Sequence, residues 1–153
     1  MKLQAIAILT FLIFENVMAQ ETTTAKYINS TDMEALKLTQ EWDKTFPQSD
    51  KVEHTKITFH NRYGITLAAD LYKPKNTQGR LAAIAVSGPY GAVKEQVSGR
   101  YAQTLAERGF LTIAFDPSYY GESGGTPRYL TSPEISTEDF SAAVDYLTSR
   151  ADV

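Results

Sequence analysis

Two glycine-bearing loops hold the residues of this chain that could do chemistry. The first reads SGPYG at 87–91, and the second contains GESGG at 121–125. The second loop fits the pattern G-x-S-x-G, in which a serine is the nucleophile of acyl transfer. Each loop follows a nearly continuous apolar run, which predicts a buried strand. Because open α/β sheets hold their ligands at the carboxyl ends of such strands, we expect these two loops to carry the function.

Ser123, the serine of that pattern, is nevertheless not predicted to be a nucleophile. A nucleophile elbow is a sharp turn that joins a strand directly to a helix, so that the serine lies at the tip of the strand. Here the strand should end at about Phe115, and the next helix should begin near Ser136 or Thr137. Roughly twenty residues of loop lie between them. We therefore interpret 121–125 as part of a long loop.

The composition excludes several classes of site and partner. The 153 residues, 42% hydrophobic and 22% charged, are typical of one ordinary globular domain. A net charge of −3 gives no basic footprint, so we expect no nucleic-acid partner. The chain has no cysteine and only two histidines, which argues against disulfides and a protein metal site. The pattern G-x-G-x-x-G is missing after the first buried strand, and we expect no dinucleotide or other cofactor.

The first elements that position the loops form a predicted antiparallel hairpin. Alternating residues at Val52–His60 and Ile65–Tyr72 are joined by NRYG at 61–64. Period-2 patterning around a short loop with glycine is typical of a hairpin. Its two histidines, His54 and His60, fall on the polar face, where we expect them to be solvated rather than catalytic.

Two parallel strands and three helices complete the expected order. Continuous apolar runs predict strands at Leu81–Val86 and Phe110–Phe115. A capping box, TDME at 31–34, predicts a helix to about Lys44, ended by Pro47. The other two helices are predicted from their apolar faces. The first of them has the face Tyr101, Ala102, Leu105 and Ala106 and is ended by Gly109. The second should run from near Ser136 to Arg150 and has the face Phe140, Ala143, Val144 and Leu147.

The amino-terminal residues 1–19 are predicted to be a signal peptide. Lys2 is followed by an apolar stretch from Ala5 to Phe14, and VMA at 17–19 suits cleavage before Gln20. The alternative of an uncleaved membrane anchor stays open. Cleavage would place the chain in an exported compartment, periplasmic or secreted, without a stable membrane span. Residues 20–50 are then a linker and the first helix, and residues 51–153 form the domain.

Four phrases in this order resemble a known family. They are NRYGITLAADLYKP, SGPYGAVKEQ, ERGFLTIAFDPSYYGESGG and STEDFSAAVDYL. Together they resemble α/β-hydrolases related to dienelactone hydrolases, acetyl-xylan esterases and Xaa-Pro-peptidase-like enzymes. The resemblance covers 51–153 and implies an α/β fold: the N-terminal portion of an α/β-hydrolase, with an antiparallel hairpin followed by β-α-β-α with parallel strands, truncated before the nucleophile elbow.

The resemblance also implies roles for residues of the two loops. The first would be an oxyanion loop, in which backbone N–H groups stabilise a developing negative charge. Pro89 has no N–H, so Tyr90 is the expected donor, although many relatives have His-Gly where this chain has Gly88-Pro89. An ordinary βα turn stays open as the alternative. The second loop would line a pocket and be anchored by an aspartate. The implied pocket-lining residues are Gly88, Gly91, Asp116, Tyr119 and Tyr120.

The expected catalytic triad is absent from this sequence. In α/β-hydrolases the triad runs in the order nucleophile, acid and histidine, but both histidines here precede every plausible nucleophile. We expect a full-length form to hydrolyse an ester, lactone or amide of a small molecule, and this chain to be an inactive fragment. We also expect the fragment to be poorly soluble or molten. The alternative is a non-catalytic module that binds a small molecule or a protein through Tyr90, Tyr119 and Tyr120.

Overall fold

The computed structural model describes residues 35–153. The predicted signal peptide, the linker that follows it and the capping box of the predicted first helix lie outside the described residues. Within 35–153, no helix combines the length and the apolar character that crossing a membrane requires.

A four-stranded mixed sheet forms the centre of the described domain. Its strands are β1 (Val52–His60), β2 (Thr66–Pro74), β3 (Ala83–Val86) and β4 (Leu111–Phe115), in the order β1-β2-β4-β3. β2 is antiparallel to both β1 and β4, whereas β3 and β4 are parallel. The predicted hairpin and the two parallel strands are therefore confirmed.

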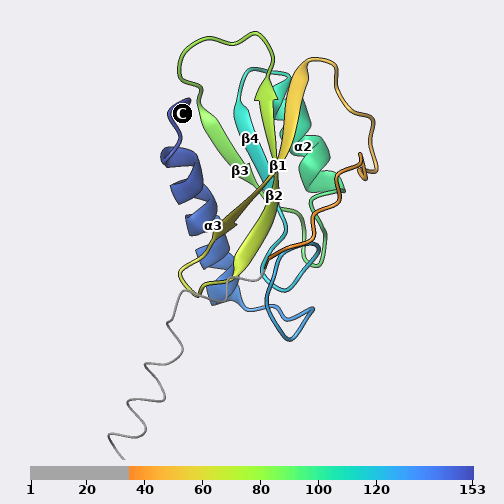
Figure 1. Ribbon diagram of the computed structural model, residues 1–153, viewed down its shortest axis with the longest axis vertical. Coiled ribbons are helices and arrows are strands. Elements are labelled where there is room, and N and C mark those ends of the chain that lie inside the picture. The colour runs from red at the N-terminus through yellow and green to blue at the C-terminus, as the bar shows by residue number, and fades with distance from the viewer. Residues whose placement is uncertain (1–34) are drawn as a thin grey trace, which may run out of the picture. The chain divides into compact units, whose positions relative to one another are not determined.

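Two helices cover the two faces of this sheet. α2 (Val97–Ala106) and α3 (Pro133–Thr148) lie on opposite sides of the strands, as Figure 1 shows. Ala142, Ala143 and Leu147 of α3 pack on one face with Phe59, Leu67 and Phe115. Ala102 and Ala106 of α2 pack on the other with Val52 and Tyr72. The order hairpin, β3, α2, β4, α3 is the β-α-β-α series that the sequence predicts.

The buried face of α2 differs from the predicted one. Ala102 and Ala106 are buried as expected, but Tyr101 is 63% exposed, and the remaining buried positions are Ser98, Gly99 and Gln103. The reason is the close approach of the helix to its neighbours. A Cβ atom on Gly99 would overlap the carbonyl oxygen of Lys94. Apart from Gln103, the inward-facing residues are therefore small, and the large ring of Tyr101 faces outward.

α3 begins earlier than predicted and is rotated about its axis. Ser132 is its N-cap and Pro133 its first residue, a pairing that suits a helix start. Phe140 and Val144, predicted to be buried, are 43% and 50% exposed. Acidic residues take part of the inner face instead, namely Glu138 and Asp139, because both bind backbone groups of neighbouring loops.

Residues 35–44 are not helical, contrary to the prediction. They form an extended strap that contacts the hairpin. The indole of Trp42 lies edge-on to His54, with ring centroids 5.2 Å apart, and Lys44 Nζ lies 3.0 Å from an Asp70 carboxylate oxygen. Side chains two positions apart do not face the same way on a helix. The extended strap therefore lets both Trp42 and Lys44 reach the hairpin.

Candidate functional site

A cavity of about 170 Å³ lies between the two glycine-bearing loops and the first turns of α3. Residues 87–91 of the first loop line it, together with 117–120 and 130–132 of the second, and with Ile135, Ser136, Asp139 and Phe140. The loops meet because β3 and β4 are parallel, so both strands end at the same edge of the sheet. This is the edge where open α/β sheets hold ligands.

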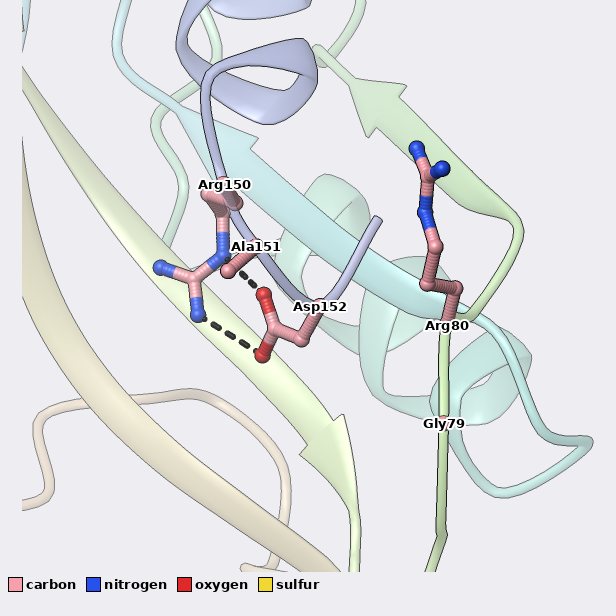
Figure 2. A pocket seen from close by; sticks show the side chains of 5 residues that line it. All are labelled: Gly79, Arg80, Arg150, Ala151 and Asp152. Atoms are coloured by element: carbon pink, nitrogen blue, oxygen red, sulfur yellow. Dashed lines mark hydrogen bonds and ion pairs between the residues drawn. The ribbon is translucent and has the colours of Figure 1, made fainter.

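A larger hollow, of about 560 Å³, lies at the amino end of β3 and is formed by Gly79, Arg80, Arg150, Ala151 and Asp152 (Figure 2). Arg150 and Asp152 are already paired with each other, and Arg80 Nε donates to the backbone carbonyl of Val153 at 2.5 Å. The Arg150 guanidinium donates to both oxygens of Asp152, at 2.8 and 2.9 Å, and Lys73 Nζ lies 2.9 Å from the same carboxylate. Arg80 points away from this pair in Figure 2. We therefore place the candidate site at the smaller cavity.

The first loop presents Tyr90 at the mouth of the cavity. Ala92 N donates to Pro89 O at 3.0 Å, and Gly91 has φ +75°, so residues 89–92 form a turn with glycine at its third position. No acceptor among the described residues binds the Tyr90 N–H. That donor is available to a ligand, and its role in an oxyanion hole stays a prediction.

Five of the six residues singled out from the sequence line the cavity: Gly88, Tyr90, Gly91, Tyr119 and Tyr120. Asp116 does not, contrary to the prediction, because its carboxylate is fully buried behind the loops. One oxygen accepts from Lys94 N at 2.7 Å. The other accepts from Lys94 Nζ at 2.7 Å and from Glu122 N at 2.9 Å. Asp116 thereby fastens the end of the first loop to the second.

Gly121 permits this closure of the second loop on Asp116. A Cβ atom at Gly121 would overlap the Asp116 carboxylate. The residue also has φ +51°, in the left-handed region where glycine is favoured. The glycine that makes this stretch resemble a nucleophile motif therefore serves the loop's own geometry.

Ser123 is a structural residue of this loop. Its hydroxyl accepts from Ala68 N at 2.8 Å and donates to Asp116 O at 2.7 Å. The residue is buried and is not among those that line the cavity. Its environment agrees with the interpretation that Ser123 is not a nucleophile.

A network of buried and partly buried charges extends from Asp116 to the strap. Lys94 Nζ lies 2.8 Å from Glu122 and 2.5 Å from Glu95. Lys56 Nζ bridges Glu122 at 2.7 Å and Asp43 at 3.1 Å. The network ends in two pairs that share Asp70, one with Lys44 at 3.0 Å and one with His54 at 2.8 Å.

The pKa directions follow from this pairing. Burial alone would raise the pKa of Glu122, but hydrogen bonds from Lys56 and Lys94 outweigh it and lower the pKa to about 2. Burial would likewise lower the pKa of Lys94, yet the Asp116 carboxylate raises it. Burial, followed by the charge of Asp116, raises the pKa of Glu95. The network holds its charges through mutual contact, which is the condition for burying them.

Three carboxylates of this network have oxygen atoms within 4.8 Å of one another, a spacing that could suit a metal ion. They belong to Asp43, Glu95 and Glu122. The ammonium groups of Lys56 and Lys94 already contact these carboxylates. The cluster is therefore best described as an ion-pair network.

The histidine prediction is half wrong. His60 is exposed, as expected. His54 is largely buried, because its ring packs against Trp42 and Tyr72 and its Nε2 contacts Asp70. Neither histidine is among the residues that line the cavity in the described part of the chain. A serine–histidine pair is therefore not assembled there.

Asp139 is a site residue that the sequence reasoning missed. Its carboxylate accepts from the Asn61 amide, from Ser118 N and from Ser118 Oγ, each at 2.8 Å. It thereby ties the β1–β2 turn and the start of the second loop to α3. The sequence signal for it is an acidic residue beside the apolar positions of one helix face.

The family model of the X-Pro dipeptidyl-peptidases (S15 family) matches residues 63–152, which is 90 of the 153 residues. The chain belongs to this family. The matched range contains both loops, the cavity and all the elements from β2 to α3. The strap and β1 precede it, so the charge network joins residues of the family's range to residues outside it.

Curated relatives extend the comparison. PA2218 of Pseudomonas aeruginosa is 69% identical over 82% of this chain and 34% of its own. YcjY of Escherichia coli is 52% identical over 63% of this chain and 33% of its own. The thiohydrolase aneE of Aspergillus aculeatus is 30% identical over 65% of this chain and 30% of its own. The chain thus spans about a third of the length of the curated relatives that it matches.

Solved structures show the same fold. The crystal structure of PA2218 superposes with a TM-score of 0.77 at 70% identity, covering 78% of this chain and 38% of that one. The α/β hydrolase GrgF from Penicillium sp. superposes with a TM-score of 0.58 at 23% identity, covering 64% and 33%. The described domain is therefore the N-terminal portion of an α/β-hydrolase fold, and its family is hydrolase-like.

Proposed function

We propose that the protein built on this chain cleaves or transfers the acyl group of a small ester, thioester, lactone or amide by nucleophilic catalysis. In this proposal the chain supplies the oxyanion-binding loop and one wall of the pocket. The observation that carries it is the unpartnered Tyr90 N–H beside a cavity at the carboxyl ends of β3 and β4. The thiohydrolase name of aneE supports acyl chemistry.

The proposed role of Tyr90 follows from the charge that acyl transfer develops. When a nucleophile adds to the carbonyl carbon, the carbonyl oxygen becomes an oxyanion. A backbone N–H that is already fixed in position stabilises this charge without reorganisation. The turn at 89–92 fixes the Tyr90 N–H in this way. The nucleophile, the acid and the base come from outside the described residues.

Two substitutions at Tyr90 test the proposal in the protein expressed from the complete reading frame that contains this chain. Tyr90→Pro removes the N–H at a turn position that proline favours, and should lower kcat on p-nitrophenyl acetate about 10²–10³-fold. Tyr90→Phe keeps the N–H and should leave kcat within about threefold. Equal losses in both variants would contradict an oxyanion role. Turnover by residues 1–153 alone, abolished by Ser123→Ala, would contradict the assignment of both loops.

A binding module is the second candidate function. The observation that favours it is that no histidine lines the cavity within residues 35–153. A complete reading frame that ends at Val153 and yields a soluble, inactive product would support this candidate. A downstream G-x-[SC]-x-G elbow followed by a distant histidine would support the hydrolase.

We also propose that the protein is exported, with cleavage after Ala19. The support is the sequence of the first 19 residues, in which a lysine, an apolar stretch and small residues occur in that order. Amino-terminal sequencing of the mature protein should begin at Gln20. A mature chain that keeps Met1 would contradict the proposal.

A further inference from the structure

The candidate cavity has the size of a single ring. Its volume is about 170 Å³, whereas pockets for drug-sized ligands have about 300–1,000 Å³. An apolar cavity of about 150 Å³ is known to take one benzene molecule. A compact group of that size therefore fits between the two loops and α3.

Aromatic side chains from three elements surround this space. Tyr90 comes from the first loop, Tyr119 and Tyr120 come from the second, and Phe140 comes from α3. Such walls favour an aromatic ligand, because offset and edge-to-face ring pairs add about 0.5–1.5 kcal/mol beyond area burial.

Three of these rings are held in place by the fold. Tyr119 lies at φ +73° against Gly125, where a Cβ atom would collide with its ring, and its N–H donates to Gly124 O at 2.8 Å. The Tyr120 hydroxyl lies 2.6 Å from Thr131 Oγ1. The Phe140 ring stands edge-on to Phe115, with centroids 5.0 Å apart. These walls are therefore preformed.

Residues 35–153 offer no charge that a ligand in the cavity could reach. Asp139 is the one charged residue among those of 35–153 that line it, and it is only 1% exposed, with its carboxylate engaged by Asn61 and Ser118. No lysine or arginine of the described chain lines the cavity. Ser136 also lines the cavity. A cation or an anion would lose its hydration there without a direct counter-charge.

We propose that this cavity binds one uncharged aromatic ring. The identity of the substrate rests in addition on the proposed function. If that function holds, the substrate is an ester, thioester or amide whose uncharged aromatic portion lies between Tyr90, Tyr120 and Phe140.

Binding of three ketone and amine probes to the protein from the complete reading frame tests this proposal without turnover. Acetophenone is uncharged and aromatic, cyclohexyl methyl ketone is its saturated counterpart, and benzylammonium is aromatic and charged. We expect titration by NMR to give acetophenone at least threefold tighter binding than the saturated ketone and at least tenfold tighter binding than benzylammonium. Tightest binding of benzylammonium would assign the rings to a cation and overturn the proposal. Equal or tighter binding of the saturated ketone would overturn its aromatic part.

A pair of phenylalanine substitutions on α3 locates the bound probe. Ser136→Phe places a ring inside the cavity and should weaken acetophenone binding at least tenfold. Ser141→Phe places the same ring on an exposed position of α3 and should leave binding unchanged. Equal effects would overturn the assignment to this cavity, and the probe comparison decides the ligand class even if Ser136→Phe does not fold.

Acetophenone binding without hydrolysis of any ester would overturn the proposed function alone, whereas hydrolysis without acetophenone binding would overturn this inference alone.

Discussion

At the scale of single residues, the hydrogen-bond partners of Ser123 decide its role. Its hydroxyl accepts from the buried N–H of Ala68 and donates its proton to the backbone carbonyl of Asp116, and the residue is not among those that line the cavity. The pattern G-x-S-x-G alone carries no information about these partners. The expected length of the following loop does argue against a nucleophile, because a long loop is incompatible with a strand-to-helix elbow.

Ser123→Ala should therefore reduce stability rather than chemistry. Removing the hydroxyl leaves the buried Ala68 N–H without an acceptor, which costs about 1–3 kcal/mol. Urea denaturation measures this loss, and Ser141→Ala, at an exposed position of α3, is the matched control that should change little. A Ser123→Ala protein with unchanged stability and lost turnover would reverse the assignment.

Lys94 is the second residue on which the site depends. Its buried ammonium contacts Asp116, Glu95 and Glu122. Removing one partner of a buried ion pair leaves an uncompensated charge, which costs about 3–5 kcal/mol. Lys94→Met should cause a loss of that size in urea denaturation. Lys75→Met, at an exposed lysine, should stay within about 0.5 kcal/mol, and similar values for the two variants would refute the importance of the network.

Acid sensitivity should follow from Glu122. Its folded-state pKa lies near 2, below its ordinary value of 4.5, because Lys56 and Lys94 bind the charged form. The resulting stabilisation is complete above the ordinary pKa and is lost as the pH falls toward the folded-state pKa. Glu122→Gln should therefore be less stable than the parent at neutral pH, and this difference should shrink as the pH falls below about 4. Thermal melts across this pH range measure it. Glu53→Gln, at an exposed glutamate, should run parallel to the parent.

At the scale of elements, Gly99 shows how packing overrides helix propensity. Replacing a helical glycine with alanine ordinarily stabilises the helix, by up to about 1 kcal/mol, and Gly99 lies in the first turn of α2. In α2 the added Cβ would overlap the Lys94 carbonyl and press on Phe46 and Tyr72. Gly99→Ala should therefore destabilise the protein by about 1–3 kcal/mol. Arg100→Ala, at the next and exposed position, should be nearly neutral, and a higher Tm for Gly99→Ala would contradict this account of α2.

The same contrast explains which elements the sequence could predict. Strands β3 and β4 were found because continuous apolar runs report burial on both faces directly. The loops were placed correctly because parallel strands must end at one edge. The faces of α2 and α3 were only partly predicted: the alanines and Leu147 are buried as expected, but Gly99 and Asp139 also face inward. Both are fixed by contacts outside their own helix, Gly99 with Lys94 and Tyr72 and Asp139 with Ser118. The strap was misread as a helix because its partners, Asp70 and His54, lie on the hairpin, and no local pattern records that pairing.

At the scale of the whole described domain, charge and burial are divided between the two faces of the sheet. The face under α3 holds the larger apolar core. The strap with Trp42 packs on the α2 face, and from there the ion pairs run through Lys56 to the second loop. The walls of the cavity are thus fixed by polar anchors on both sides, Asp116 on one and Asp139 on the other. This arrangement suits a site whose donors must not move when charge develops.

The two edges of the sheet differ in a way that predicts how residues 1–153 behave when produced alone. The edge strand β1 carries charged and polar residues, and Glu53, Thr55 and Thr58 among them are exposed. The other edge strand, β3, is AIAV and is only partly buried. An apolar unpaired edge recruits other strands, whereas a charged one resists pairing.

We therefore expect residues 1–153, produced alone, to associate through β3 and to give large species in sedimentation velocity. Ile84→Lys should shift the distribution toward the monomer, and Thr58→Lys on β1 should not. A monomeric parent chain with one sharp thermal transition would show that the β3 edge is not a site of association.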